Sequence, residues 1–354
     1  MATMPVRAWT YTNGYPKTLK LSKTTVPTEN DVQPNHVLVK IATCALNPVD
    51  IQMMNMPKWN LPFGNYGNEK TTVMDFAGTV VASGSDNFKE GDQIFGLSLT
   101  PFVPAGGALA EMAHFNLATT PAVKKPSQWS EEKAAAISLV WLTAKACIDA
   151  VAPFVEKTST KRVAILGGSS ATGIYSTILA KRKGWKVVAT SSAKNRDFIL
   201  NNLKADSHVD YTTQPVRRAV SAFDPDAVID CVGGTECIAL PSSKRYITIV
   251  GDKTGRTMMG GPATYYDYLH PYYAVAQWLR WARGQYGSGE SYDVVILGPK
   301  KEWLEEAKST LGEEDIYVDS VHTFGDAKKA FERLNTGRAK GKVVIRVSEE
   351  RSRL

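Results

Sequence analysis

The segment ILGGSSATG, residues 165–173, combines glycines with hydroxyl side chains between a strand-like apolar run and a stretch of helical periodicity. Such a turn leaves backbone N–H groups free to face a phosphate, and the positive end of the following helix points at it. The common dinucleotide fingerprint has a glycine where this chain has Ser170. Small side chains still permit close approach, so we expect a pyrophosphate to lie against the turn. The expected contacts are Ser169, Ser170, Ala171 and Thr172.

The segment ATSSAKNR, residues 189–196, ends the next strand-like run and indicates which nucleotide is bound. Enzymes that use NAD carry an acidic residue about 20 residues after the turn, where it binds the ribose hydroxyls. In this chain no acidic residue occurs there before Asp197. Ser192, Lys194 and Asn195 instead offer hydroxyl, ammonium and amide donors to a 2′-phosphate. The sequence therefore predicts NADPH over NADH, the alternative being a polar loop without a ligand.

The elements around these two segments predict a parallel sheet. Strand-like runs alternate with helical patterns and lie at 163–168, 186–191, 227–233, 245–251 and 292–297. Such alternation is typical of βαβ units in a doubly wound sheet. Before them, from Val6 to about Lys125, short β-rich runs are broken by Gly, Pro and Asn. After them, residues 324–347 read as helix, turn and terminal strand, which by count fall outside the nucleotide sheet.

Length and composition set the domain count and exclude some partners. A chain of 354 residues most readily forms two domains. The boundaries predicted are 1–127, 128–299 and 300–354, the last segment returning to the first domain. The net charge of +7 is carried by dispersed basic doublets, which argues against nucleic acid binding. We found no apolar run of about 18 residues and therefore expect no membrane span. The N-terminus lacks the apolar core of a signal peptide.

The stretch 262–287 is crowded with Tyr and Trp. One interpretation is a helix and loop packed on the core or on a dimer partner. The other is an aromatic lid over a flat, unsaturated substrate. The first interpretation is favoured, and the second stays open.

Seven blocks of the sequence occur in the order typical of one family. They are ALNPVDI (45–51), MDFAGTVVASG (74–84), FKEGDQIFG (88–96), GGALAEMAHF (106–115), AAAISLVWLTA (134–144), ILGGSSATG (165–173) and GRAKGKVVIRV (337–347). Over essentially its full length the chain resembles the zinc-independent, quinone-oxidoreductase-like branch of the medium-chain dehydrogenase/reductase superfamily, which includes reticulon-interacting oxidoreductases and fungal enoyl reductases. The resemblance implies an α/β protein. A GroES-like β-rich catalytic domain, formed by both ends of the chain, would accompany a doubly wound, parallel-sheet Rossmann domain that binds NADP.

The resemblance also predicts that no metal is bound. Zinc-dependent relatives have cysteine where this chain has Asn47, a His-Glu pair at Met74-Asp75, and a second cysteine at Leu139. A catalytic zinc site needs thiolate, imidazole or carboxylate ligands. The amide, thioether and isobutyl groups present here cannot form one, so oxidation through a zinc-bound alkoxide is not expected.

Further cofactor contacts are implied by the resemblance. The nicotinamide would lie near Pro48, Val49, Asp50, Ile51 and Thr143. The adenosine 2′-phosphate would face Ser192, Lys194, Asn195 and Tyr211. The wall of the site would be completed by Val250, Gly251, Gly341 and Lys342.

Two residues are candidates for catalysis. The phenol of Tyr66 lies where some related enoyl reductases place a tyrosine, and it could protonate an enolate. An exposed loop tyrosine, with solvent as proton donor, is the favoured alternative. Asn47 could orient the carboxamide or the substrate carbonyl, although a turn-forming Asn before Pro48 explains it almost as well.

Without a metal to polarise oxygen, the easier hydride acceptors spread developing charge over an enolate or hydroquinone. We therefore expect an NADPH-dependent, zinc-independent oxidoreductase that reduces a quinone or an α,β-unsaturated carbonyl. One alternative is a trans-acting enoyl reductase of a polyketide pathway, and another is an NADPH-binding interaction protein with little turnover. The resemblance favours a homodimer. The ending Ser352-Arg353-Leu354 is similar to a peroxisomal signal, so an import receptor is a candidate partner and the location is cytoplasmic or peroxisomal.

Overall fold

The computed structural model describes residues 2–12, 14–55, 69–103, 105–251, 271–287, 289–298 and 300–348. These residues form two compact units. The first unit contains the described residues up to Leu139 and those from 300 to 348, and the second contains the described residues of 140–251 and 271–298. Both ends of the chain thus build the first unit. The change of unit falls at 139/140, after the predicted position 127/128, because the helix Glu131–Ala135 contacts the strands of the first unit.

The first unit is rich in β-structure and has two sheets. A three-stranded sheet has the order β2-β1-β4, with β1 (Thr3–Tyr11), β2 (Lys20–Pro27) and β4 (Lys70–Thr71). A seven-stranded sheet has the order β15-β16-β3-β5-β6-β8, and β7 also pairs with β3. Its strands are β3 (His36–Leu46), β5 (Asp75–Ser83), β6 (Gln93–Leu97), β7 (Met112–Asn116), β8 (Ala122–Lys124), β15 (Val318–Thr323) and β16 (Lys342–Arg346). The terminal strand β16 pairs antiparallel with β3 and so returns the end of the chain to the first unit.

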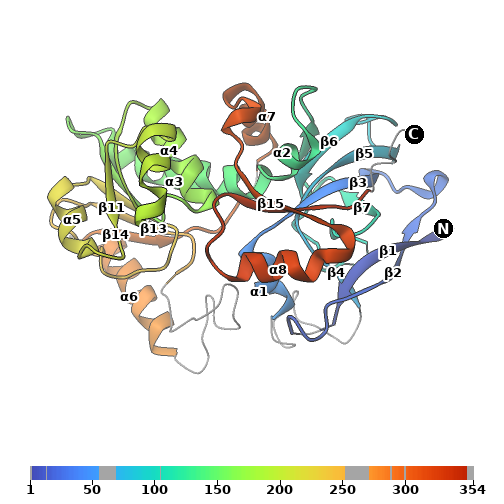
Figure 1. The fold of residues 1–354 in the computed structure, drawn as a ribbon, viewed down its shortest axis with the longest axis horizontal. Coiled ribbons are helices and arrows are strands. Elements are labelled where there is room, and N and C mark those ends of the chain that lie inside the picture. The colour runs from blue at the N-terminus through green and yellow to red at the C-terminus, as the bar shows by residue number, and fades with distance from the viewer. Residues whose placement is uncertain are drawn as a thin grey trace. The chain divides into compact units, whose positions relative to one another are not determined.

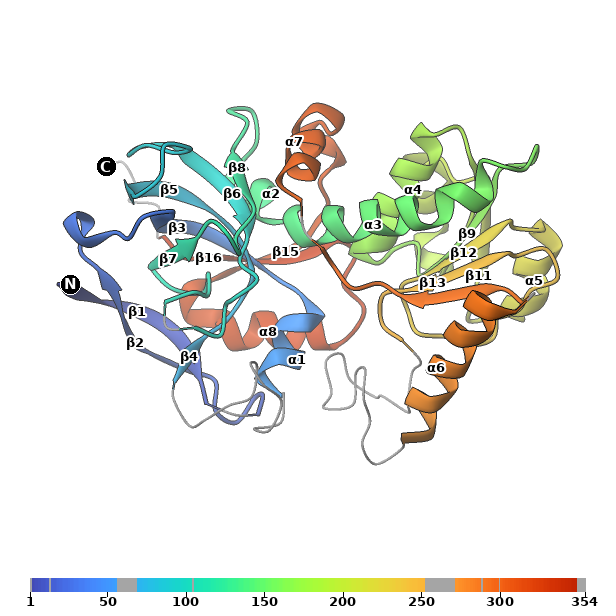
Figure 2. The same cartoon turned by 180° about the vertical axis from the view of Figure 1, so that it is seen from behind.

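Helices of the first unit contact this larger sheet or one another. They are α1 (Pro48–Met54), α2 (Glu131–Ala135), α7 (Lys301–Thr310) and α8 (Ala327–Asn335). Short 3₁₀ turns occupy Glu29–Asp31, Glu313–Asp315 and Phe324–Asp326. In α8 the buried residues Ala327, Ala330, Phe331 and Leu334 follow the spacing of one helical face. Helices α8 and α1 lie side by side in both views (Figures 1 and 2).

The second unit is a doubly wound parallel sheet with the strand order β11-β10-β9-β12-β13-β14. The strands are β9 (Arg162–Leu166), β10 (Lys186–Ser191), β11 (Ser207–Asp210), β12 (Ala227–Asp230), β13 (Arg245–Thr248) and β14 (Ser291–Val294). The helices are α3 (Ser138–Val155, which begins in the first unit), α4 (Ala171–Arg182), α5 (Val216–Phe223) and α6 (Pro271–Tyr286). The predicted fold class, a GroES-like β domain with a Rossmann domain, is confirmed.

Two elements of the second unit differ from what the sequence predicted. The edge strand β11 was not predicted, because its four residues carry little apolar pattern. After the strand-like run 186–191, where a helical pattern was expected, the chain forms a 3₁₀ turn at Ala193–Asn195 and then a short π-type turn at Phe198–Asn202. This tight turn brings the chain back to the edge strand β11, which begins at Ser207.

Helix α3 corrects the expectation about membrane spans. By length and composition alone it is apolar enough to cross a membrane. Its side chains Val140, Trp141 and Leu142 are fully or almost fully buried within the protein. A buried core helix meets the same criterion, so α3 is weak support for a membrane span.

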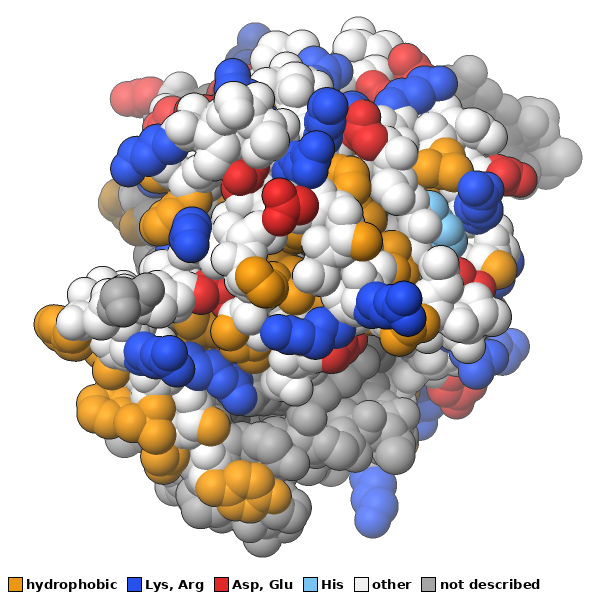
Figure 3. Space-filling view, turned by 90° about the vertical axis from the view of Figure 1, so that its left-hand side faces the viewer, with side chains coloured by type: hydrophobic (Ala, Val, Ile, Leu, Met, Phe, Trp, Pro, Cys, Tyr) orange, Lys and Arg blue, Asp and Glu red, His pale blue; other side chains and the backbone are white. Residues whose placement is uncertain are grey.

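The aromatic stretch contributes α6, and its part before Pro271 lies outside the described residues. Helix α6 contacts β14 and packs Trp281 onto the core of the second unit. The other face of α6 exposes Tyr272, Val275, Trp278, Leu279 and Tyr286. Hydrophobic side chains gather toward the lower left in Figure 3, whereas the Lys and Arg side chains on this face are scattered. The packed-helix interpretation accounts for one face of α6 only.

Candidate functional site

The turn between β9 and α4 has the predicted form of strand, glycine turn and helix. Strand β9 ends at Leu166, Gly167 adopts a φ of 82°, and α4 begins at Ala171. Ser170 is the N-cap of α4, and its Oγ accepts a hydrogen bond of 3.1 Å from the Gly173 N–H. This capping satisfies one of the free N–H groups of the first helical turn.

The three glycines of the turn are each required by a close approach. A Cβ on Gly167 would lie 2.4 Å from Cγ1 of Val232, and one on Gly168 would lie 2.7 Å from Cβ of Ala189. On Gly173, a Cβ would lie 2.3 Å from the carbonyl oxygen of Gly167. Residue 170, in contrast, has an ordinary φ of −69°. The turn therefore keeps glycine where its geometry demands it and accepts serine at the cap.

Thr190, at the end of β10, ties the turn to the neighbouring strand. The N–H of Gly167 donates to Thr190 Oγ1 at 2.9 Å, and the N–H of Gly168 donates to the Thr190 carbonyl at 2.8 Å. Within the described part of the chain, the N–H groups of Ser169, Ala171 and Thr172 have no acceptor. These groups stand at the positive end of α4, where an anion is favoured. The turn thus fits a pyrophosphate.

The end of β10 lies next to this turn. Asn195 Nδ2 donates to Ser169 Oγ at 3.1 Å. This bond joins a residue predicted to contact the 2′-phosphate to one predicted to contact the pyrophosphate. Lys194 is exposed, Ser192 is partly exposed, and Tyr211 is 58% exposed. The Tyr211 N–H donates to the Ser191 carbonyl at 3.2 Å, so Tyr211 shares this edge of the sheet. The four residues predicted for the 2′-phosphate are therefore grouped at the carboxyl ends of β10 and β11.

A neighbouring histidine adds little charge to this edge. His208 Nε2 lies 2.8 Å from Ser191 Oγ. Burial, together with the nearby Arg196 guanidinium, lowers the pKa of His208. A neutral imidazole at neutral pH leaves Lys194 and Arg196 as the cations here.

The Asp230 side chain binds the backbone of the loop after β12 and the Thr248 hydroxyl at the end of β13. Asp230 ends β12 beside β9, where the strand order reverses and ligands of such sheets bind. Its Oδ1 accepts from the N–H groups of Val232 and Gly233, both at 2.9 Å, and its Oδ2 accepts from Thr248 Oγ1 at 2.8 Å. Burial raises the pKa of Asp230 to about 6, although these hydrogen bonds oppose the shift.

Thr248, which donates to Asp230, in turn holds the backbone of the loop that contains Val250 and Gly251. Its Oγ1 accepts from the N–H of Val250 at 3.3 Å and from that of Gly251 at 3.1 Å. Val250 and Gly251 were predicted as cofactor contacts, whereas Asp230 was missed. The signal available in the sequence was a single carboxylate within the otherwise apolar run AVIDCVG.

In the first unit, the start of α1 is held by a capping box. Asn47 is the N-cap, Pro48 begins the helix, and Asp50 is at the third helical position. Asp50 Oδ2 accepts from the Asn47 N–H at 2.7 Å, and Oδ1 accepts from the Met74 N–H at 3.2 Å. These two bonds of the Asp50 side chain fix the entry into the helix. Pro48 and Val49 are partly exposed, whereas Ile51 is buried.

Asp75, at the start of β5, is the centre of a buried polar network. Its Oδ1 accepts from the Leu139 N–H at 2.9 Å. Its Oδ2 accepts from Asn47 Nδ2 and from Lys342 Nζ, both at 2.9 Å. Lys342 also donates to Asn47 Oδ1. We call Asn47, Asp50, Asp75 and Lys342 the buried network.

The buried network carries unbalanced charge out of contact with water. Asn47 and Asp50 are each 1% exposed, Asp75 is 0% exposed and Lys342 is 2% exposed. Burial raises the pKa of Asp50 to about 7, and the Asp75 carboxylate adds to the rise, while the Asn47 N–H and the Lys342 ammonium oppose it. Burial and the same two carboxylates also raise the pKa of the Cys44 thiol.

The predicted site residues Asn47 and Lys342 direct their side chains into the buried network, whereas Gly341 is required by the shape of a turn. Asn47 has both ends of its amide engaged inside the network, and the Lys342 side chain points inward to the same network. Gly341 has a φ of 88°, and a Cβ there would lie 2.2 Å from the Tyr317 carbonyl oxygen, so the turn before β16 requires glycine. Thr143, in the second unit, is 8% exposed on α3. Tyr66 lies outside the described residues.

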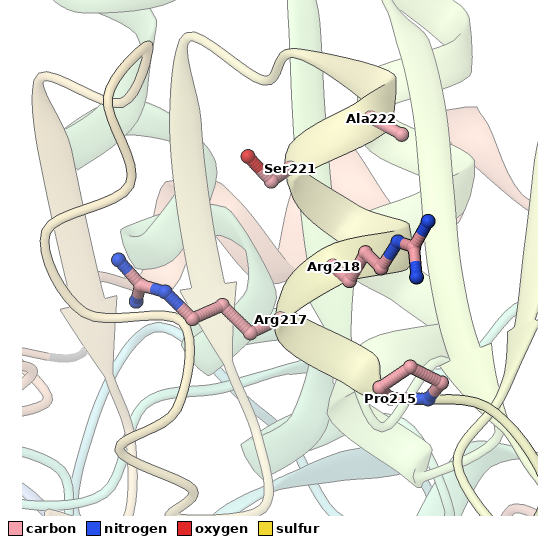
Figure 4. Close-up of a pocket in the computed structure, with 5 residues that line it drawn as sticks. All are labelled: Pro215, Arg217, Arg218, Ser221 and Ala222. Carbon is pink, nitrogen blue, oxygen red and sulfur yellow. The ribbon is translucent and has the colours of Figure 1, made fainter.

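One open hollow in the described part of the chain carries no such chemistry. It measures about 570 Å³ and is lined by Pro215, Arg217, Arg218, Ser221 and Ala222. The side chains of Arg217 and Arg218 point to different sides of α5 (Figure 4). Arg217 donates to backbone carbonyls of the following loop, at Glu236, Ile238 and Ala239. The hollow lacks an acid, a base or a nucleophile suited to the predicted reaction.

A GroES-like β domain joined to a Rossmann domain defines a class of nicotinamide-dependent oxidoreductases. Residues 33–121 match the family model of the alcohol dehydrogenase GroES-like domain, and residues 203–345 match that of the zinc-binding dehydrogenase. The chain belongs to the medium-chain dehydrogenase/reductase superfamily, in its quinone-oxidoreductase-like branch. The predicted family is confirmed.

Three similar proteins illustrate this membership. The mitochondrial NAD(P)H oxidoreductase RTN4IP1 of Danio rerio is 28% identical, with 90% of this chain and 85% of that protein covered. Trans-enoyl reductase pgmF of Aspergillus terreus is 28% identical, with 98% of both chains covered. The structure of the quinone oxidoreductase from Coxiella burnetii matches with a TM-score of 0.74 at 24% identity, covering 98% of this chain and 100% of that one, and it shows the shared fold.

The name of one matching family model implies zinc, and the buried network allows a test of that implication. The three positions that correspond to zinc ligands in zinc-dependent relatives do converge here, through the contacts of Asp75 with Asn47 and Leu139. Asp75 is the one carboxylate at these positions, and it already binds the Lys342 ammonium. An ammonium at this distance repels a divalent cation, and an amide with a backbone N–H does not complete a zinc site. These residues do not fit zinc.

Proposed function

We propose that this oxidoreductase uses NADPH, needs no zinc, and transfers hydride to a quinone or to an α,β-unsaturated carbonyl compound. The observation that carries the proposal is the acid-free end of β10, where Ser192, Lys194 and Asn195 adjoin the phosphate turn. A carboxylate at the end of β10 would repel a 2′-phosphate, whereas these donors attract one. The carboxylate of Asp210, at the end of the neighbouring strand β11, is engaged by Thr212 and Thr213. The name of the zebrafish relative, an NAD(P)H oxidoreductase, supports a nicotinamide cofactor.

Each group of residues has a distinct task in this proposal. The bound nicotinamide supplies the hydride. The N–H groups of Ser169, Ala171 and Thr172, at the positive end of α4, hold the pyrophosphate. Lys194 and its polar neighbours hold the 2′-phosphate, with Tyr211 beside them. Asp230 and Thr248 keep the loops at Val232 and Gly251 in place.

Residues near the nicotinamide come largely from the start of α1. Pro48, Val49, Asp50 and Ile51, with Thr143, stay proposed contacts, and Val250, Gly251, Gly341 and Lys342 stay proposed wall residues. The side chains of Asp50 and Lys342 are buried and bound by other protein groups, so in this proposal these two residues face the cofactor with their backbone. Because no metal polarises the acceptor, conjugated carbonyl compounds and quinones, which delocalise the charge, are the proposed substrates. Proton donation by Tyr66 or by solvent stays a proposal, and so does orientation of a carbonyl group by Asn47.

A second candidate is a trans-acting enoyl reductase. The observation that favours it is the similarity to pgmF over nearly the whole length of both chains. This candidate predicts turnover of enoyl thioesters and poor turnover of free quinones. The interaction-protein alternative predicts NADPH binding without oxidation by any acceptor. A homodimer and peroxisomal import through Ser352-Arg353-Leu354, which lie outside the described residues, also remain proposals, as does a cytoplasmic location.

The direct test titrates the purified chain with NADPH and with NADH, and then follows oxidation of the nicotinamide with quinones, enals and enoyl thioesters. We expect tighter binding of NADPH and turnover with at least one of these acceptor classes. Equal affinity for the two nucleotides would remove the 2′-phosphate argument. Failure to bind either nucleotide would overturn the whole proposal.

A further inference from the structure

The ammonium of Lys342 is an unusual feature of the first unit. Lysine side chains are almost never fully buried unless they are paired, and this one is 2% exposed. Its two acceptors come from segments far away in the sequence, Asn47 at the start of α1 and Asp75 at the start of β5. The contacts join the terminal strand β16 to both segments.

We propose that Lys342 is a positioning residue, whose buried ammonium fixes the start of α1 by holding Asn47 and Asp75 in one arrangement. The proposal rests on the function proposed above, in which Pro48 to Ile51 contact the nicotinamide. It assigns Lys342 an action through other residues and not through the cofactor.

The contacts of Asn47 show how the ammonium controls the helix. Asn47 is held at three atoms: its N–H by Asp50, its Nδ2 by Asp75, and its Oδ1 by Lys342. Since Asn47 is the N-cap, these three bonds set the direction in which α1 leaves β3. Loss of the ammonium leaves the amide oxygen without its donor and allows the cap to rotate.

The Lys342 ammonium also offsets the negative charge of the two carboxylates in the buried network. Asp50 and Asp75 face Lys342 from α1 and β5, Cys44 faces the same carboxylates from β3, and Tyr11 faces Asp50 from β1. Lys342 is the cation among these groups. Without it, a proton must neutralise one carboxylate, because two buried carboxylates side by side repel each other. A variant lacking the ammonium is therefore expected to work better in acid than in alkaline solution.

The test compares Lys342→Ala with Lys328→Ala, which removes an exposed lysine on α8. We expect Lys342→Ala to lower kcat roughly 10- to 100-fold, because small displacements of positioning groups have effects of this size, and to leave the Kd for NADPH nearly unchanged. The control should behave like the wild type. In addition, n-propylammonium should restore kcat of Lys342→Ala, and n-propanol should not, since only the first returns a cation to the cavity.

Several outcomes decide the matter. An unchanged kcat in Lys342→Ala, or a loss that is equal at all pH values and not restored by n-propylammonium, would overturn the proposal. If Lys342→Ala does not fold, the double variant Lys342→Met with Asp75→Asn removes both charges. Recovery of folding in that variant supports the charge argument, and failure of both contradicts it. Absence of turnover in the wild type would instead be a failure of the proposed function.

Discussion

The phosphate turn and the buried network use different physical means to hold a group in place. The turn relies on backbone N–H groups, three glycines and the end of a helix, and Ser169 to Thr172 bear no charge. The buried network relies on two carboxylates and an ammonium that are at most 2% exposed. The turn should therefore respond mainly to changes in backbone shape. The network should respond mainly to changes in charge.

The largest effect is expected when the charge balance of the buried network is broken. Asp75→Leu leaves the Lys342 ammonium buried without its carboxylate and the Leu139 N–H without its acceptor. The free energy of unfolding should fall by about 3 to 5 kcal/mol, as for other buried pairs that lose one partner. Urea denaturation measures this change.

Glu305→Ala provides the matched control for this prediction. Glu305 pairs with Lys308 one helical turn away on the exposed side of α7. Its loss should change the free energy of unfolding by no more than about 0.5 kcal/mol. If Asp75→Leu were as mild as this control, the buried network would not be a charge-dependent element.

The next effect concerns pH and Asp50. The folded protein holds the pKa of Asp50 at about 7, above the value near 3.9 of an unfolded chain, so the folded state binds the proton more tightly. This contribution to stability is fully present below pH 4 and is lost as the pH rises through 7. Between pH 5 and pH 7 it should fall by roughly 2 kcal/mol.

Asp50→Asn isolates this contribution, because it removes the titrating group and keeps an acceptor oxygen. The difference in unfolding free energy between wild type and variant, measured from pH 4 to pH 8, should follow the predicted decline. A difference independent of pH would show that Asp50 is already ionised in the folded protein at low pH.

Backbone shape is tested in the phosphate turn. Gly173→Ala places a methyl group 2.3 Å from the Gly167 carbonyl oxygen, so the turn and the helix must separate. We expect a loss of about 1 to 3 kcal/mol in stability, as for other overpacked sites, and weaker NADPH binding. Ser170→Gly should cost only a few tenths of a kcal/mol, because glycine is a good N-cap. Thermal denaturation and NADPH titration of both variants give the comparison, and similar losses would mean that the serine cap matters as much as the glycine.

How far sequence reasoning succeeds also differs between the two regions. Residues of the phosphate turn are neighbours in the chain, so the glycine spacing, the N-cap and the adjoining strand indicate it directly. The buried network joins Asn47 to Asp75 and to Lys342, which lie 28 and 295 positions further along the chain. No local pattern reports such a contact. The sequence therefore did not indicate that the side chains of Asp50 and Lys342, which stay proposed cofactor contacts, lie buried in this network.

Similar reasons explain the errors in the fold. Helices such as α4 and α8 were predicted because their apolar spacing and their ends are local signals. Strand β11 was missed because it is short and lies at the edge of its sheet, where burial imposes little apolar pattern. The helical segment after Ser130 is divided at Ala136 and Ile137 into α2 and α3, although both residues are compatible with a helix. Helix α2 contacts the strands of the first unit, whereas most of α3 belongs to the second unit.

The last prediction concerns an exposed charge, whose removal should change the binding of one nucleotide and leave the stability of the fold unchanged. Lys194→Glu at the end of β10 should raise the Kd for NADPH by roughly 10- to 100-fold, since a hydrogen bond to a charged phosphate is replaced by repulsion. Binding of NADH, which lacks the 2′-phosphate, should change little. Lys186→Glu is the matched control, because Lys186 is an exposed lysine at the opposite end of the same strand. Titration of both variants with both nucleotides at low ionic strength decides the point. Equal weakening of NADPH and NADH binding in Lys194→Glu would place Lys194 away from the 2′-phosphate and leave the choice of cofactor to Ser192, Asn195 and Tyr211.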